Sequence, residues 1–286
     1  MISVAHFLVT RFNLRPDYTH TWQLDERWLG PRFELFERFC FPTVRGQTEQ
    51  DFQWLVLFDS STPESFRRRI EGYARWQNFN PVFVDPGTNG AARKSVEARL
   101  AQMPLPDVLL TTRLDNDDGM CRTFMEELRA HADVPAPTIL NFPVGYVWHR
   151  GRLYRYHFPL NAFATFAEPA SALHGAAFRT VYTGSHTDVA QLGRVIEVND
   201  RPSWLQVVHG GNLENRRRGV REARARLREN FDIDEPLTEV PEGAVGLYLE
   251  TAYTAACTGA GDWCRAALKS ASRAIRKSGS DGTDKR

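Results

Sequence analysis

The chain has 286 residues, 42% of them hydrophobic and 12% aromatic, so it can bury a substantial core. A formal net charge of +1 gives no global field for binding nucleic acid, and four scattered cysteines exclude a disulfide framework. The N-terminus lacks a signal-peptide pattern, and no apolar run approaches the ~18 residues that span a bilayer. We therefore expect a cytoplasmic protein with at most peripheral contact with the inner face of the membrane.

The first 130 or so residues alternate strand and helix patterns. Apolar, β-prone runs predict strands at 2–9, 52–58, 81–85 and 108–112. Helical periodicity predicts helices at 28–41, 63–76, 91–102 and 119–132, the first ending before Pro42 and the second capped by Thr62. This alternation predicts an α/β fold with a mostly parallel central sheet and helices on both faces.

After Pro135 the pattern changes to short strands, which we expect at 138–142, 145–149, 153–157, 163–166 and 204–209. The second and third of these form a hairpin candidate. Helices are expected at 214–230, 247–256 and 262–277, and the polar end at 278–286 has the composition of a disordered tail.

The acidic run Asp115–Asp118 follows directly on the predicted strand 108–112. Ligands bind at this carboxyl edge of the sheet in open α/β folds. Asp115 and Asp117 have the D-x-D spacing, so their carboxylates can share one hard divalent cation, which can hold a diphosphate. Arg113 adds positive charge beside them. The alternative is an acid-rich first turn of a helix. The metal interpretation points to an enzyme that acts on a nucleotide-activated donor.

A second group of candidates lies between the third strand and the next helix. Gly90 gives the backbone freedom there, and Arg93 and Lys94 bring positive charge to the free N–H groups of a helix start. Such a place suits a diphosphate, although a plain turn has the same composition.

Polar residues also follow the first two predicted strands. Arg11 and Asn13 follow the first strand and Asp59 follows the second, so all three face the same crevice. A carboxylate in that place can accept a hydrogen bond from the N3–H of a pyrimidine base. A helix-capping turn explains Asp59 equally well.

The last candidates are a histidine and three possible bases. His209 ends a predicted strand and precedes Gly210, an open position where a neutral imidazole can be a third metal ligand or a structural residue. His186, Asp188 and Asp200 are candidates for deprotonating an acceptor hydroxyl. A helix cap at Asp188 and a turn at Asp200 are the alternatives, and spacing does not choose between them.

With these residues in place, the chain resembles the GT-A class of nucleotide-sugar glycosyltransferases. More narrowly, it resembles the bacterial family of putative rhamnosyltransferases. The segments that carry the resemblance are Arg11–Asn13, Trp28–Leu29, Arg32–Glu37, Gln47–Thr48, Asp51–Phe52, Trp54, Thr112–Asp118 and Trp204–Gly210. They span residues 1 to about 215, and the C-terminal segment is not covered.

The resemblance implies a role for several of these positions. Asp115 and Asp117 would hold Mn²⁺ or Mg²⁺, and His209 would match a late metal-binding histidine of such enzymes. Arg93 would match a basic residue that faces the phosphates, whereas Lys94 stands where asparagine is often found. The implied donor is a nucleotide diphosphate sugar linked to dTDP, UDP or GDP. The implied acceptor is a carbohydrate or glycolipid, and nucleic acid is not a partner.

We therefore expect a GT-A-like catalytic domain over residues 1–235, with a nucleotide-binding half at 1–130 and an acceptor and metal half at 131–235. A helical extension would follow at 236–277. The expected activity is metal-dependent, inverting transfer of a sugar, with rhamnose as the candidate, to an acceptor hydroxyl. The rivals are a nucleotidyltransferase, which releases pyrophosphate, a binding protein for nucleotide sugars or carbohydrates that has lost catalysis, and a metal-dependent hydrolase.

Overall fold

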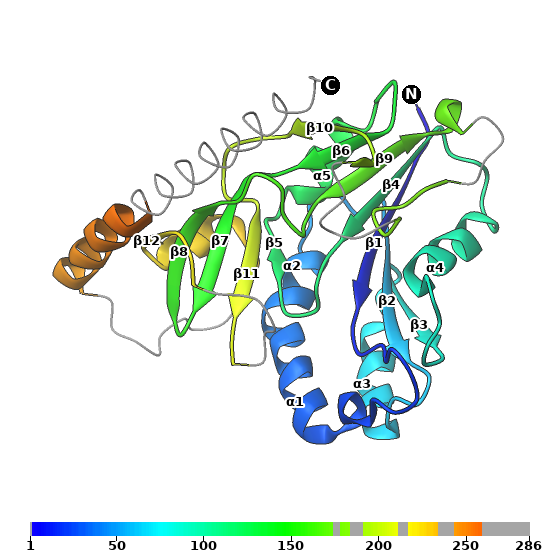
Figure 1. The fold of residues 1–286 in the computed structure, drawn as a ribbon, viewed down its shortest axis with the longest axis horizontal. Helices are drawn as coiled ribbons and strands as arrows, with labels where there is room; N and C mark the ends of the chain where they lie inside the picture. The colour runs from blue at the N-terminus through cyan, green and yellow to red at the C-terminus, as the bar shows by residue number, and fades with distance from the viewer. Residues whose placement is uncertain (1, 174–177, 184–190, 211–216, 234–242, 259–286) are drawn as a thin grey trace, which may run out of the picture.

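The computed structural model describes residues 2–173, 178–183, 191–210, 217–233 and 243–258, and the chain folds there into two sheets (Figure 1). The first sheet has seven strands in the order β10 (Arg194–Glu197), β6 (Thr138–Asn141), β9 (Thr165–Pro169), β4 (Val108–Arg113), β1 (Val4–Arg11), β2 (Gln53–Asp59) and β3 (Phe79–Val84). The second has five strands in the order β12 (Val220–Glu222), β8 (Arg152–His157), β7 (Val144–His149), β11 (Trp204–Val208) and β5 (Gly119–Met120).

The first sheet confirms the predicted α/β architecture. Strands β1 to β4 are parallel neighbours, in the spatial order β4-β1-β2-β3. Because parallel strands end at the same edge, the last residues of β1, β2 and β4, which are Arg11, Asp59 and Arg113, share one edge of the sheet. Strand β9 runs antiparallel between β4 and β6, so the sheet is mixed at that side.

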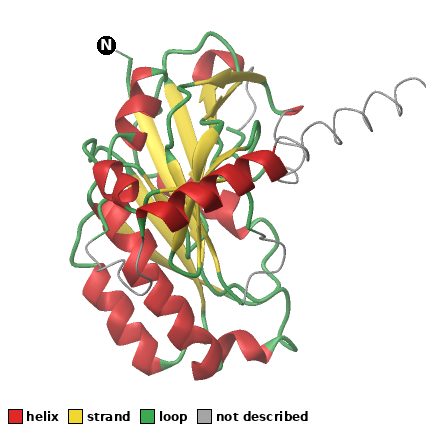
Figure 2. Cartoon of the chain, turned by 90° about the vertical axis from the view of Figure 1, so that its left-hand side faces the viewer, coloured by secondary structure: helices red, strands yellow, loops and turns green. Residues whose placement is uncertain are grey.

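Both faces of this sheet are buried, as its continuously apolar strands require. One face packs against α1 (Glu26–Leu35), α2 (Phe41–Arg45), α3 (Glu64–Tyr73) and α5 (Phe124–Ala130), and the other packs against α4 (Ala91–Leu100). Successive residues of β1 alternate between these cores: Leu8 lies in the larger core, and Phe7 and Val9 lie in the smaller one. Figure 2 shows helices on either side of the strands.

The predicted helix at 28–41 is longer than its pattern indicates. Helix α1 runs into a π-helical turn, Phe36–Cys40, and then into α2, so the expected end before Pro42 is wrong. Pro42 lies in the first turn of α2, directly after the π-helical turn, in which the N–H of Phe41 bonds to the Phe36 carbonyl five residues back.

The predicted helix at 119–132 is wrong at its start. Gly119 and Met120 form β5, which pairs antiparallel with β11, and α5 begins only at Phe124. The second sheet was not expected as a separate unit. Pairing with strands far along the chain overrides the local helical pattern here.

The arginine-rich segment 214–230 also departs from its predicted helix. Its described part contains the strand β12 and the short helix α6 (Ala225–Asn230). The buried Arg221 explains the strand: its N–H donates to Thr254 and its guanidinium pairs with Glu250 at 3.0 Å. Both partners belong to a helix at 244–258, coloured orange in Figure 1, which confirms the helix predicted at 247–256.

The strand expected at 163–166 begins two residues later, as β9. The segments expected at 262–277 and 278–286 lie outside the described residues, so the proposed domain division stays a prediction. In the described part of the chain, no helix has both the length and the apolar character needed to cross a membrane.

A tight hairpin joins β7 to β8, as predicted, through the two turn residues Arg150 and Gly151. Both have positive φ, 50° and 73°, which is the signature of a type I′ turn. Asn-Gly or Asp-Gly is the usual pair in such a turn. An arginine in the left-handed region costs roughly 1 kcal/mol more than glycine would.

Substituting Gly145 tests the packing that holds the second sheet. A Cβ added to Gly145 would overlap the ring of the fully buried Trp204, so Gly145→Ala is expected to destabilise the fold by about 3 kcal/mol. Gly30→Ala is the matched control, because Gly30 lies within α1 with open space around its Cα; this variant should gain about 0.5–1 kcal/mol. Urea denaturation measures both, and equal midpoints for the two variants would contradict the packing.

The buried His6 predicts how stability depends on pH. Burial, with a smaller effect from Arg129, lowers the pKa of His6 to about 3 from 6.5, and its Nε2 lies 2.8 Å from the Thr112 hydroxyl. The folded state therefore binds this proton less well than the unfolded state, and the stabilisation is lost as pH falls from about 6.5 towards 3.

His6→Gln removes this titration. The difference in unfolding free energy between the natural protein and His6→Gln should shrink by about 1.4 kcal/mol per pH unit as pH falls below 6.5. Denaturant titrations at pH values between neutral and mildly acidic measure the slope. A difference that does not vary with pH would show that His6 is not the responsible group.

Candidate active site

The structure brings together Asp117 and His209, which are 92 positions apart in the sequence. Nε2 of His209 lies 2.8 Å from Oδ2 of Asp117. The same carboxylate oxygen lies 3.0 Å from a guanidinium nitrogen of Arg32, which comes from α1. The side chain of Asp117 is 6% exposed and that of His209 is 21% exposed. The pair therefore faces solvent through the histidine, at the end of β11.

Asp118 has a different role from its neighbour, although the two are adjacent in the acidic run. Its side chain is buried, and its Oδ1 accepts a hydrogen bond of 2.9 Å from the backbone N–H of Val207. Burial, together with the charges of Asp117 and Asp115, raises the pKa of Asp118 well above its usual value of 3.8. Asp118 therefore anchors β11 two residues before His209.

Asp115 points elsewhere. Its carboxylate pairs with the guanidinium of Arg113 at 3.2 Å, and its side chain is 40% exposed. Within the described ranges, no three or more histidine, cysteine or acidic side chains are grouped as metal ligands. Of the three predicted ligands, the structure thus brings together Asp117 and His209 and directs Asp115 towards Arg113.

The donor atoms of the Asp117–His209 pair fit a divalent cation. A carboxylate oxygen and a neutral imidazole nitrogen are both ligands that Mn²⁺ accepts. In the structure Arg32 and His209 both contact one oxygen of Asp117, so the guanidinium already compensates part of its negative charge. Asp115 is exposed enough to turn towards a cation there.

Asp59 lies beneath the edge formed by the ends of β1, β2 and β4 rather than on its surface. It is fully buried, and its two carboxylate oxygens accept hydrogen bonds of 2.8 and 3.0 Å from Arg15. The amide of Asn13 bridges the Asp59 N–H and the Thr62 hydroxyl, both at 3.1 Å. Direct contact between Asp59 and a base therefore stays a prediction, and it requires Arg15 to move.

Thr62 is not the N-cap of α3. Its hydroxyl donates to the Asp59 carbonyl at 2.7 Å, and Pro63 occupies the N-cap position. The local turn chemistry is nonetheless as expected for the sequence after β2, because Asp59 also accepts from the N–H of Ser61 at 2.7 Å.

The other basic candidates surround this edge. Arg11 lies at the end of β1, with its guanidinium 5.6 Å from the ring centre of Tyr182. Gly90, with φ of 67°, precedes α4 as its N-cap. Arg93 in the first turn pairs with Glu97 of the same helix, and Lys94 is exposed.

The structure describes only one of the three candidate bases. His186 and Asp188 lie outside the described residues. Asp200 is exposed in the turn between β10 and β11, where its carbonyl accepts a 3.2 Å hydrogen bond from Arg155. The turn predicted for Asp200 is confirmed, and its role as a base stays a prediction.

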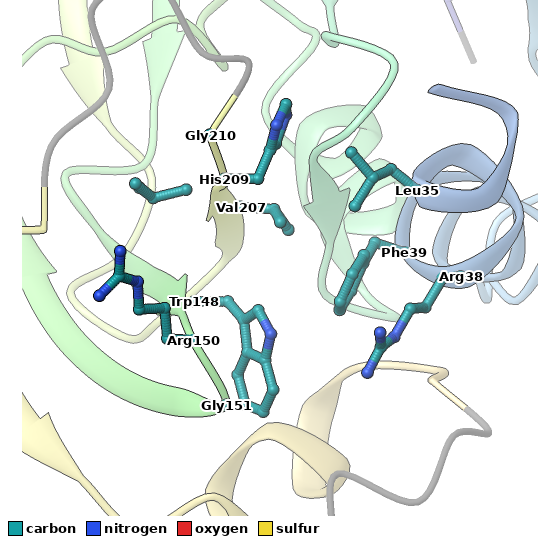
Figure 3. Close-up of a pocket in the computed structure, with 10 residues that line it drawn as sticks. Leu35, Arg38, Phe39, Trp148, Arg150, Gly151, Val207, His209 and Gly210 are labelled. Carbon is teal, nitrogen blue, oxygen red and sulfur yellow. The ribbon is translucent and has the colours of Figure 1, made fainter. Parts of the chain in front are cut away.

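A cavity of about 300 Å³ lies beside His209 (Figure 3). The residues that line it come from α1 and the π-helical turn, from the β7–β8 hairpin and from the end of β11: Leu35, Arg38, Phe39, Trp148, Arg150, Gly151, Val207, Val208, His209 and Gly210. His209 thus contacts Asp117 and also lines this cavity, so a molecule held in the cavity would lie near Asp117.

The sequence assigned no contact role to two arginines of the site. Arg32 and Arg15 precede the strands and acids that they contact, and their partners are 85 and 44 positions away. Arg32 lies within a motif of the resemblance, whereas the chain holds many arginines like Arg15. Only the fold identifies them.

Comparison with known proteins gives distant structural similarities. The structure of Staphylococcus aureus TarS 1-349 in complex with UDP superposes with a TM-score of 0.44 at 11% identity, over 71% of this chain and 60% of that one. The mannosyltransferase PcManGT of Pyrobaculum calidifontis, in complex with GDP-Man and Mn²⁺, gives 0.39 at 11% identity, over 72% and 56%. GalNAc-T7 with UDP, GalNAc and Mn²⁺ gives 0.38 at 13% identity, over 73% and 45%.

This chain therefore spans about 60% of the TarS fragment that it matches. No curated protein sequence matches it. The family described as "Putative rhamnosyl transferase" matches residues 18–221, which include the acidic run, the cavity-lining residues and the whole of β11. The chain belongs to this putative rhamnosyl transferase family.

Proposed function

We propose that the protein transfers a sugar from a nucleotide diphosphate donor to an acceptor hydroxyl, with a divalent cation, Mn²⁺ or Mg²⁺, at Asp117 and His209. The observation that carries the proposal is the convergence of His209 and Arg32 on one oxygen of Asp117, at the carboxyl edge of a parallel sheet. The family supports rhamnose as the sugar, and the proposed donor carries it on dTDP, UDP or GDP.

The residues of the chain have separate tasks in this mechanism. When bound, the cation would be held by Asp117, His209 and a reoriented Asp115, and it would neutralise charge on the leaving diphosphate. Arg11, Arg93, Lys94 and Arg113 lie at or near the same edge and add positive charge for the phosphates. Asn13 and Asp59 shape the floor on which the nucleotide would rest.

The transfer itself needs a base near the cavity. The acceptor oxygen forms a bond to C1 of the sugar while the bond from C1 to the diphosphate oxygen breaks, and the electron pair leaves with the nucleoside diphosphate. The acceptor proton passes to a carboxylate, for which Asp188 and Asp200 are the candidates, or to His186. Attack on the face opposite the diphosphate inverts the configuration at C1. No covalent intermediate is then required.

Donor binding tests the cation site. UDP, dTDP or GDP at a hundred times its dissociation constant should add about 2.7 kcal/mol to the unfolding free energy, and only with Mn²⁺ present. Asp117→Asn should lose this Mn²⁺-dependent rise in melting temperature. Asp133→Asn removes the same charge from an exposed position after α5 and should retain it.

If Asp117→Asn keeps the full shift, the assignment of Asp117 to the cation is wrong. If none of the nucleotides stabilises the natural protein, the proposed donor class is wrong. Product analysis separates the rival chemistry, because sugar transfer releases a nucleoside diphosphate whereas nucleotidyl transfer releases pyrophosphate.

Replacing the base candidates one at a time separates them. Loss of a general base lowers turnover by roughly 10²–10⁴-fold, so Asp188→Asn and Asp200→Asn are predicted to differ by that factor in kcat. Their affinity for the nucleoside diphosphate should stay unchanged. Transfer assays decide between them: the variant that keeps full activity excludes its residue. Full activity in both would assign the role to His186.

A further inference from the structure

The cavity beside His209 has an unusual arginine on one wall. Arg150 is the only residue other than glycine with a positive φ in the described part of the chain. Its place in the turn favours asparagine, aspartate or glycine. An arginine there gains nothing from the turn, so the turn geometry alone does not account for it. Strained backbone of this kind is concentrated at binding sites.

The opposite wall has a second backbone irregularity and a second arginine. Arg38 and Phe39 belong to the π-helical turn between α1 and α2, and π turns inside helices are frequent at functional sites. Figure 3 shows Arg38 and Arg150 on opposite sides of the cavity, with Trp148 between them; the ring of His209 points away from both. The cavity is therefore framed by two cations contributed by distant parts of the chain.

The chemistry of the lining indicates the ligand. The ten lining residues include two arginines and one histidine and no carboxylate. Burial lowers the pKa of His149, and the charges of Arg150, Arg217 and Arg152 lower it further. The electrostatic potential around the hairpin is therefore positive. Trp148 offers an aromatic surface to the same cavity, and such surfaces suit the apolar face of a sugar ring. Guanidinium groups bind carboxylates and phosphates in a bidentate manner.

We propose that this cavity binds the acceptor, and that the acceptor is an acidic carbohydrate whose carboxylate or phosphate is held by Arg38 and Arg150 beside Trp148. The inference rests on the proposed transferase function and adds the chemical class of the acceptor to it. The position agrees with the chemistry, because His209 lines the cavity and contacts Asp117, where the donor diphosphate would end.

Ligand-observed NMR on the full chain tests the charge of the acceptor. The probes are methyl glucuronide, inorganic phosphate and the neutral methyl glucoside. At least one anionic probe should bind about tenfold more tightly than methyl glucoside, since a charged hydrogen bond contributes about that factor. Preference for the glucuronide would assign a carboxylate, and preference for phosphate would assign a phosphorylated sugar.

Three variants locate the binding. Arg150→Asn removes the charge but is favoured in the turn, so it should melt at or above the temperature of the natural protein while binding the anionic probe about tenfold more weakly. Arg38→Gln should weaken the same probe. Arg152→Gln is the control, because Arg152 lies on the same hairpin outside the lining, paired with Glu250 at 3.2 Å, and its loss should leave the affinity unchanged.

The outcomes separate this inference from the proposed function. Equal binding of charged and neutral probes, or unchanged affinity in Arg150→Asn, would overturn the acidic acceptor while Mn²⁺-dependent nucleotide binding still supported the transferase. Weaker nucleoside diphosphate binding by Arg150→Asn would assign the arginine to the donor and overturn the inference. Absence of nucleotide binding in the natural protein would overturn both the transferase and the acceptor assignment.

Discussion

The arrangement of the site depends on one buried hydrogen bond, from the N–H of Val207 to the carboxylate of Asp118. It joins the end of the acidic run on the first sheet to the end of β11 in the second sheet. Together with the pairing of β5 and β11, which follows directly after Asp118, it places Asp117 beside His209. The burial of Asp118 among other acids is unfavourable for its charged form, and the hydrogen bond from Val207 and the charge of Arg113 oppose this only in part.

The edge formed by the ends of β1, β2 and β4 likewise has buried polar side chains beneath its exposed ones. Asp59, Arg15 and Asn13 are almost inaccessible to solvent, and they satisfy one another through short hydrogen bonds. Buried and fully paired groups of this kind fix the backbone at strand ends, so the exposed Arg11 starts from a defined position. Asp59, the acidic residue at the end of β2, therefore supports this edge from below.

The sequence predicted the parallel strands and the strand-end acids because each has a local signal: an apolar run, then a polar break. His209 was found for the same reason. The second sheet was not predicted, since Gly119 and Met120 pair with residues about 85 positions away and no local pattern records this. Motif residues were also ambiguous in role: the buried Gln47 holds the Thr43 and Cys121 carbonyls rather than a ligand.

Asp117 and His209 are 92 positions apart in the sequence, so they are synthesised at different times. Strands β1 to β4 end at Arg113, and the acidic run follows them directly at Asp115–Asp118. The histidine and the strand that carries it follow some 90 positions later, and contacts of such long range form slowly. A nascent chain that ends before β11 therefore contains the acidic run but lacks the histidine that contacts it. The two halves of the pair become available at separate stages of synthesis.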